Sequence, residues 1–325
     1  MPGFTTHYIF GMKAYNDMPF TPLKHTIAKY RWLYQLGLQG PDMFFYNIPI
    51  LRHRDYRNVG SYMHEHKVNA FFECCLRRIG TIRSRQQQEE AISYLAGFIN
   101  HYIADSICHP YVYGRIGYPV DAPTSMHHGM HAHLENELDA ILLWKYKKKK
   151  PSEFNQTATI CLNGQEIQFI SHFLASCINE TYYPITYRNN FQVTPAMVHR
   201  SIWALRFGCR TLSDKNGKKK FGIAQVESIF VNHPVASAKM VTDSVTDYRS
   251  SCNLNYEAWS NPWDPTRVST ASFVDLFHET LDKCSRVYAL LNSAVTDNMP
   301  LDKQDLSPLL AELGNESYHS GLPVN

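Results

Sequence analysis

The stretch His101-Tyr-Ile-Ala-Asp105-Ser-Ile-Cys-His109-Pro110 organises the sequence. It closes a long helical pattern that begins near Ser84, and the proline is expected to end that helix. Side chains four residues apart lie on one face of a helix, so His101, Asp105 and His109 are expected to form one stripe. Their neighbours are bulky and apolar, which predicts that the stripe is buried. Buried imidazole and carboxylate groups need partners, and a divalent metal ion is a natural one.

A second histidine-rich segment, residues 127–137 (HHGMHAHLENE), opens the next predicted helix. His131 precedes Glu135 by four residues, and His133 precedes Glu137 by four. Zinc binds imidazole nitrogen and carboxylate oxygen, and such a pair can present both to one ion. The alternative is that these are ordinary core histidines and acidic residues on a solvated face. Two His/carboxylate pairs on successive helices favour the metal site.

The composition is that of a globular protein. The chain has 325 residues, of which 44% are hydrophobic and 19% charged, so it can bury a large core. The net charge of +3 is too small to indicate a nucleic-acid-binding protein. The first residues lack the pattern of a signal peptide, and no apolar run is long enough to span a bilayer, so a cytoplasmic location is expected. The eight cysteines are expected to be reduced, and several of them, Cys108 included, to be core residues.

Elsewhere the patterns predict mostly helices. Residues 1–20 are expected to be short and irregular, and residues 21–38 to form a helix that stops at Gly40-Pro41. Further helices are expected over 68–80, 134–150, 166–182, 194–213, 222–246 and 270–296. A small hairpin is expected near 161–167, a loop over 260–270, and loose packing over 299–325. The fold class is therefore all-α: a single mostly helical domain over 1–325, with a metal-site half of about 1–150 and an additional helical half of about 165–300.

The candidate metal ligands all lie in the first half of the chain: His7, Asp42, His64, His101, Asp105, His109, His131 and Glu135. This set is too large for one tetrahedral zinc ion and sufficient for two or three. Clustered zinc ions activate water and hold the attacking and leaving oxygens in phosphoester displacement. A nearby carboxylate can serve as general base. The residues alone thus predict a metal-dependent hydrolase of a phosphoester.

The order of these motifs resembles that of the zinc-dependent phospholipase C family, which includes bacterial phosphatidylcholine-preferring phospholipase C and the clostridial alpha-toxin. The matching pieces span about residues 1–145 and are Thr-His7-Tyr-Ile, Asp42, His64, the His101-xxx-Asp105 helix and His131-xxx-Glu135-Asn-Glu-Leu-Asp139. The resemblance implies a helical catalytic domain with three zinc ions that cleaves phospholipids on the glycerol side of the phosphate.

The resemblance also implies which residues bind each ion. The three sites would be His64, His101 and Asp105 with Asp42; His109, His131 and Glu135; and His7 and Asp105 with the free amino terminus, here Pro2 after removal of Met1. Asp42 is implied to be the catalytic general base. His109 departs from the family pattern, because it follows the aspartate by four residues where the family has six.

Other functions stay open at this point. A related zinc-dependent single-strand nuclease would need a basic groove, which the net charge does not indicate. A phosphohydrolase of the His-Asp dipeptide class is excluded because the chain contains no such dipeptide. A non-catalytic, metal-stabilised binding protein is a third alternative. The basic run 147–150 is expected to stabilise the carboxyl end of its helix, and contact with lipid headgroups is the alternative. The expected partners are a phospholipid or other phosphodiester, with transient contact to a membrane surface; no nucleic acid is expected.

Overall fold

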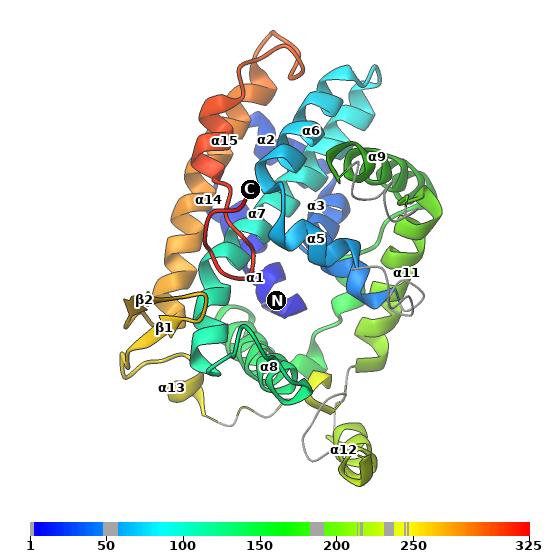
Figure 1. Cartoon of the computed structure of the whole chain (residues 1–325). Coiled ribbons are helices and arrows are strands. Elements are labelled where there is room, and N and C mark those ends of the chain that lie inside the picture. The colour runs from blue at the N-terminus through cyan, green and yellow to red at the C-terminus, as the bar shows by residue number, and fades with distance from the viewer. Residues whose placement is uncertain are drawn as a thin grey trace.

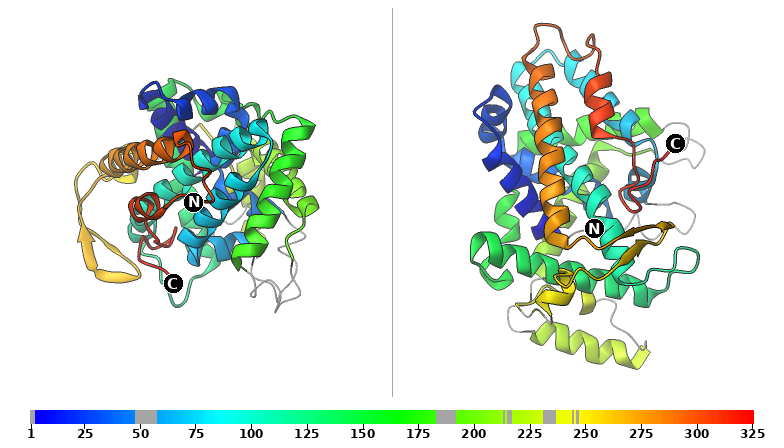
Figure 2. Two further views of the ribbon diagram at one scale, coloured as in Figure 1. Left: turned by 90° about the horizontal axis from the view of Figure 1, so that it is seen from above. Right: turned by 90° about the vertical axis from the view of Figure 1, so that its left-hand side faces the viewer.

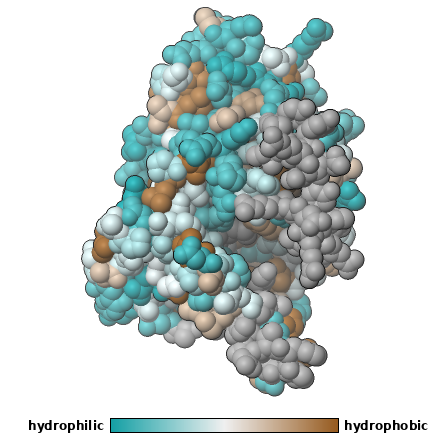
Figure 3. Space-filling model, viewed as in Figure 1, coloured by the Kyte–Doolittle hydropathy of each residue, from teal (hydrophilic) through white to brown (hydrophobic). Residues whose placement is uncertain are grey.

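The computed structural model describes residues 3–47, 58–182, 192–212, 214, 217–230, 237–243, 245 and 247–325. Within these ranges the regular structure is almost entirely helical, with one two-stranded antiparallel sheet (Figure 1). The predicted all-α fold class is confirmed. Among the described residues, none of the helices combines the length and the apolar character that crossing a bilayer requires. Hydrophilic residues dominate the face shown in Figure 3, and apolar residues form scattered patches on it.

The elements of the first part, in chain order, are α1 (Phe4–Asp17), α2 (Pro22–Lys29), α3 (Arg31–Gly37), the 3-10 helix η1 (Gly40–Tyr46), α5 (Val59–Glu65), α6 (Val68–Thr81), α7 (Arg85–Arg115) and α8 (Ser125–Lys147). The second part contains η2 (Pro151–Glu153), η3 (Gln156–Thr159), α9 (Gly164–Tyr182), α11 (Pro195–Leu212), α12 (Lys218–Phe230), η4 (Ser237–Lys239), α13 (Tyr248–Ser251), β1 (Trp259–Asn261), β2 (Asp264–Ser269), α14 (Phe273–Thr296) and α15 (Ser307–Leu313).

Helix α7 is the central element of the fold. Nearly all of its side chains beyond Glu90 are buried, and α1, α2, α3, α6, α8, α9, α14, η1 and β1 all pack against it. Gly37 of α3 and Gly97 of α7 meet backbone to backbone: a Cβ at Gly37 would overlap the carbonyl oxygen of Tyr94, and one at Gly97 that of Tyr34. Only glycine permits this approach, which holds α7 close to the segment that precedes η1.

Helix α7 does not end at Pro110, as the sequence predicted, but continues to Arg115. Proline has no N–H, so the carbonyl of Ser106 loses its usual helical donor. The residues just after the proline, Tyr111 and Val112, are fully buried against α14 side chains such as Phe273. Tertiary packing on both sides of the proline thus outweighs the local penalty.

Five further predictions differ from the structure. Residues 1–20 contain the regular helix α1, and the predicted helix 21–38 is interrupted at Tyr30. The expected hairpin near 161–167 is absent from these described residues, since α9 begins at Gly164. The expected loop 260–270 is largely the β1–β2 hairpin, in which Trp259 pairs with Ser269. Residues 299–325 pack closely: α15 lies beside α14, and Tyr318 is buried (Figure 2).

Two predictions extend beyond what the structure describes. The predicted helix 222–246 overlaps α12 and η4, and its middle, 231–236, lies outside the described residues. Pro2, expected at a third zinc site, also lies outside them. The division of the chain into one domain with two helical halves stays a prediction.

Candidate metal centre

Helix α1 carries His7 and is anchored at its first turn by a side chain from α8. The backbone N–H groups of Thr5 and Thr6 donate to the Asp139 carboxylate, at 3.1 and 2.7 Å. Two of the N–H groups that a helix leaves unpaired at its start are thereby satisfied. Burial raises the pKa of Asp139 to about 6, against the opposing effect of these hydrogen bonds. The cap comes from far along the chain, which explains why local sequence did not reveal α1.

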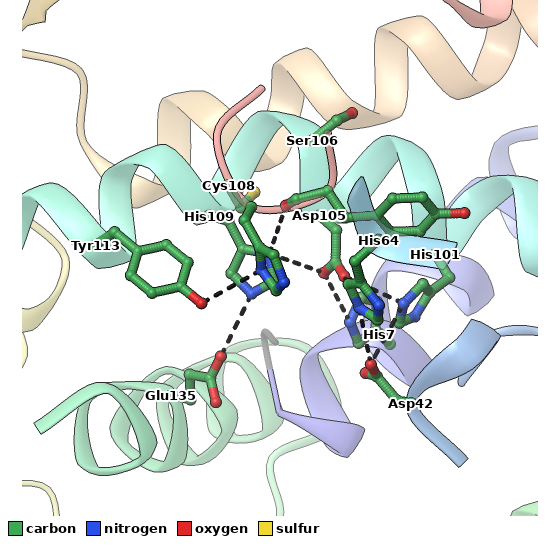
Figure 4. A network of polar contacts seen from close by, with 12 residues as sticks. His7, Asp42, His64, His101, Asp105, Ser106, Cys108, His109, Tyr113 and Glu135 are labelled. Carbon is green, nitrogen blue, oxygen red and sulfur yellow. Dashed lines mark hydrogen bonds and ion pairs between the residues drawn. The ribbon is translucent and has the colours of Figure 1, made fainter. Parts of the chain in front are cut away.

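The first group of candidate ligands lies where α1, η1, α5 and α7 meet (Figure 4). His7 Nε2 lies 3.1 Å from Asp105 Oδ1, and His101 Nε2 lies 3.1 Å from Asp105 Oδ2. His64 Nε2 lies 3.2 Å from Asp42 Oδ1 and 3.7 Å from Asp105 Oδ2. All five side chains are buried. Single donor atoms of His7, Asp42, His101 and Asp105 lie within 4.8 Å of one another, as binding one metal ion requires.

The second group consists of His109 from α7 with His131 and Glu135 from α8. Glu135 Oε1 lies 2.7 Å from His131 Nε2 and 3.6 Å from His109 Nε2. Asp105 lies between the two groups, with Oδ1 3.7 Å from His109 Nδ1 (Figure 4). The side chains of His131 and Glu135 are 13% and 10% exposed, whereas the first group is closed, so the second group lies nearer the surface.

The atoms that face each other do not form ordinary hydrogen bonds. Within the described residues, both ring nitrogens of His7, both carboxylate oxygens of Asp105 and Nε2 of His64, His101 and His109 are buried without a hydrogen-bond partner. Buried polar atoms are normally paired, so this concentration indicates a missing partner. Ligands about 2.0–2.1 Å from a tetrahedral zinc ion lie about 3.3 Å apart, close to the separations in the first group. The residues therefore fit zinc.

Three of the histidines are oriented by main-chain carbonyl oxygens. His64, His101 and His109 each donate from Nδ1, to the carbonyls of Gly60, Leu38 and Tyr318, at 2.6, 3.1 and 2.7 Å. A carbonyl only accepts, so Nδ1 carries the proton and Nε2 presents its lone pair. This is the usual arrangement behind a metal-binding histidine, in which the second partner sets the tautomer and the ring orientation.

The electrostatics of the imidazoles favour metal binding. Burial lowers the pKa of His7, and it holds the pKa values of His109 and His131 well below the usual range. His101 differs: burial lowers its pKa, but the neighbouring Asp105 and Asp42 carboxylates outweigh that effect and raise it. Burial thus favours the neutral form of the His7, His109 and His131 imidazoles, which is the form that binds zinc.

The two carboxylates respond to burial differently. Burial alone would raise the pKa of Asp105, but the imidazoles of His109, His101 and His7 outweigh it and hold that pKa well below the usual range. Burial raises the pKa of Glu135 well above its usual range. A divalent cation beside Glu135 reverses that preference, because the ion favours the charged carboxylate.

Asp42 reaches the centre because η1 approaches α7 closely. Gly40, which begins η1, has a φ of +46°, and a Cβ there would overlap the ring of His101. Glycine can adopt this positive φ and has no Cβ to overlap the ring. Asp42, two residues on, is buried and faces His64 and His101, so it is not the exposed turn aspartate that a Gly-Pro-Asp sequence commonly provides.

The second His/carboxylate pair of α8 does not join the centre. His133 is half-exposed, with Nε2 3.6 Å from Glu137 Oε1, and Glu137 also accepts a hydrogen bond from Ser251 at the end of α13. Positions 131 and 133 differ by about 200° around a helix, so the two pairs face different sides. Only the 131/135 pair lies toward α7.

The sequence did not reveal the residues 316–321, which lie against the centre. The His319 ring stacks on His64, with centroids 4.9 Å apart and an interplanar angle of 12°. Tyr113 Oη lies 3.3 Å from His319 Nδ1. The segment follows α15 as an irregular loop with no periodicity, and its histidine is isolated in sequence. Only the tertiary structure brings it to the centre.

An all-α fold around a buried histidine and carboxylate cluster that can bind metal defines a candidate zinc hydrolase. Residues 6–186 match the family model described as zinc-dependent phospholipase C, and this is more than half of the chain. The chain belongs to the zinc-dependent phospholipase C family, so the predicted resemblance is confirmed. All eight candidate residues lie within the matched range. Comparisons with curated proteins and with solved structures gave no match.

Proposed function

We propose that the chain is a zinc-dependent phosphodiester hydrolase that acts on phospholipids in the manner of a phospholipase C. The main support is the pair of adjoining donor groups, in which Asp105 of the first group contacts His109 of the second. Family membership supplies the zinc dependence and the phospholipid class of substrate. The cytoplasmic location and the membrane-surface contact expected from the sequence stay predictions.

We assign the donors to two ions. The first would be bound by His7, Asp42, His64, His101 and Asp105, and the second by His109, His131 and Glu135, with Asp105 between them. When bound, zinc ions supply Lewis acidity that lowers the pKa of a water molecule and neutralises phosphate charge. A third ion bound by the amino terminus, with His7 and Asp105, stays a prediction.

Asp42 is the proposed general base. Its carboxylate is buried, with Oδ1 3.2 Å from His64 Nε2 and Oδ2 3.8 Å from His101 Nε2. A carboxylate in this position can accept the proton of the attacking water.

The substrate is proposed to enter beside the second group, which lies nearer the surface. Tyr113, Tyr118 and Trp263 form an aromatic cluster there, with ring centroids 4.7–5.9 Å apart. The Tyr113 ring lies 4.5 Å from that of His131. An apolar wall next to a phosphate-binding centre suits a molecule with a charged phosphate and an apolar glyceride part.

The test is hydrolysis of short-chain phosphatidylcholine by zinc-loaded protein, compared with hydrolysis of single-stranded DNA. We expect phospholipid turnover and none of DNA. Asp42→Asn should lose turnover by at least about 100-fold, the scale of general-base catalysis, while keeping most of its zinc. Asp17→Asn, an exposed aspartate paired with Lys13, is the matched control and should keep full activity. Hydrolysis of DNA without hydrolysis of phospholipid would refute the proposal and favour the nuclease alternative. Full turnover by Asp42→Asn would exclude Asp42 as the general base.

A further inference from the structure

We infer that the segment 316–321 supports the metal centre, because its main chain orients the His109 imidazole and is hydrogen-bonded to the main chain of His64. The inference rests on the proposed metal-binding role of those groups. The segment lies far outside the range 6–186 that the family model matches. It therefore adds a component that family membership does not supply.

The main chain of one residue, Tyr318, reaches both groups. Its N–H donates to the carbonyl oxygen of His64, at 2.9 Å, and its own carbonyl accepts from His109 Nδ1, at 2.7 Å. The first bond ties the segment to the end of α5, and the second sets the tautomer of His109 with Nε2 facing Glu135. The imidazole of His109 is fully buried, so no solvent is available to replace this acceptor.

Contacts from three directions hold Tyr318 in place. Its ring is buried, with its centroid 4.8 Å from that of His64 and 4.9 Å from that of Tyr102. Asn261 of β1 donates from Nδ2 to the carbonyl of Ser320 at 2.7 Å. The N–H of Glu316 donates to Tyr102 Oη at 2.9 Å. The segment is thus anchored to the hairpin and to α7, which makes it a rigid support.

Gly321 lets the segment approach α7. Its φ is +60°, and a Cβ there would lie 2.5 Å from the carbonyl oxygen of Ser106 and 3.1 Å from Pro110 Cγ. Both neighbours are rigid, one being helix backbone and the other a proline ring. Any side chain at position 321 therefore forces the segment away from α7 and shifts the carbonyl that His109 requires.

The experiment measures zinc affinity by competition with a chelator and zinc content by elemental analysis, on the full chain with zinc alone. Gly321→Ala should weaken zinc binding by about 10- to 100-fold, as loss of the partner behind a metal-binding histidine does. Gly117→Ala is the matched control: its φ is also +60°, but nothing lies within 4 Å of an added Cβ. It should bind zinc like the unaltered chain.

Two further variants separate the main chain from the side chain and guard against a folding defect. His319→Ala keeps the Tyr318 main chain and should change zinc affinity by less than about threefold, whereas a loss equal to that of Gly321→Ala would show that the His319 imidazole acts instead. Asn261→Ala removes the hydrogen bond to the Ser320 carbonyl, together with the one that Asn261 Oδ1 accepts from the Trp263 N–H within the hairpin, and should weaken zinc binding in the same direction as Gly321→Ala. Unchanged affinity in both Gly321→Ala and Asn261→Ala would overturn the inference.

The result is independent of the reaction. If zinc affinity depends on the segment but the unaltered chain does not hydrolyse phospholipid, the proposed function is refuted and the inference stands. If the unaltered chain hydrolyses phospholipid but substitution at position 321 does not change zinc affinity, the inference is refuted and the proposed function stands.

Discussion

Asp105 and His109, one turn apart on α7, lie 3.7 Å from each other and join the two donor groups of the centre. The same Asp105 oxygen that faces His109 also lies 3.1 Å from His7 Nε2. The carboxylate is a donor of the first group and also contacts the His109 imidazole of the second, so its replacement is expected to affect both groups.

Asp105→Asn is expected to lower zinc content at both groups, because an amide carries no charge to balance the cations. We expect less than one zinc ion per chain by elemental analysis. His133→Gln, a change on the half-exposed face of α8, serves as control and should keep the full content. Asp105→Asn protein with undiminished zinc would show that zinc binding does not depend on this carboxylate.

Removing zinc should lower stability, because it leaves the buried imidazoles and carboxylates without their partner. An ion present at 100 times its dissociation constant stabilises a fold by about 2.7 kcal/mol. We expect a chelator to lower the melting temperature by several degrees in calorimetry, and zinc to restore it where magnesium does not. If neither chelator nor zinc changes the melting temperature, the imidazoles and carboxylates must be stable in the folded chain without a bound ion.

Gly97→Ala should destabilise the fold strongly, because the added methyl group would overlap the carbonyl oxygen of Tyr34 in α3. Overpacking of this kind costs about 1–3 kcal/mol or more in free energy of unfolding, measured with urea. Gly164→Ala, where nothing lies within 4 Å, is the control and should change stability little. Equal stability of the two variants would contradict the close approach of α3 and α7.

Asp139 should make stability fall with rising pH between about 4 and 6. Its pKa in the folded chain is raised to about 6, so over this range the folded state binds the proton that the unfolded state has released. The contribution is fully present below the unfolded pKa and is lost as pH rises through the folded one, at up to about 1.4 kcal/mol per pH unit.

The measurement compares unaltered chain with Asp139→Asn by urea unfolding at several pH values. Other carboxylates are common to both, so the difference in unfolding free energy isolates Asp139. A difference that does not change with pH would show that the Asp139 carboxylate titrates normally.

Local sequence predicted the parts of the centre that depend on helix geometry. The spacing of His101, Asp105 and His109 places them on one stripe of α7 in any α-helix, and the same holds for His131 and Glu135 on α8. The apolar residues around them predicted burial. Together with the order of motifs along residues 1–145, these features were sufficient for the all-α class, the family and the candidate ligands.

What the sequence determined by itself was therefore the helical part of the candidate donor set, the residues on α7 and α8, since helical periodicity acts within a few residues. Only the tertiary structure decided how the donors are supported. The Asp139 carboxylate on α8 caps the first turn of α1, and packing against α14 allows α7 to continue past Pro110. The Tyr318 carbonyl orients the His109 imidazole. These contacts join residues far apart in the chain, and no local pattern encodes them, because each depends on a space that the folded helices create.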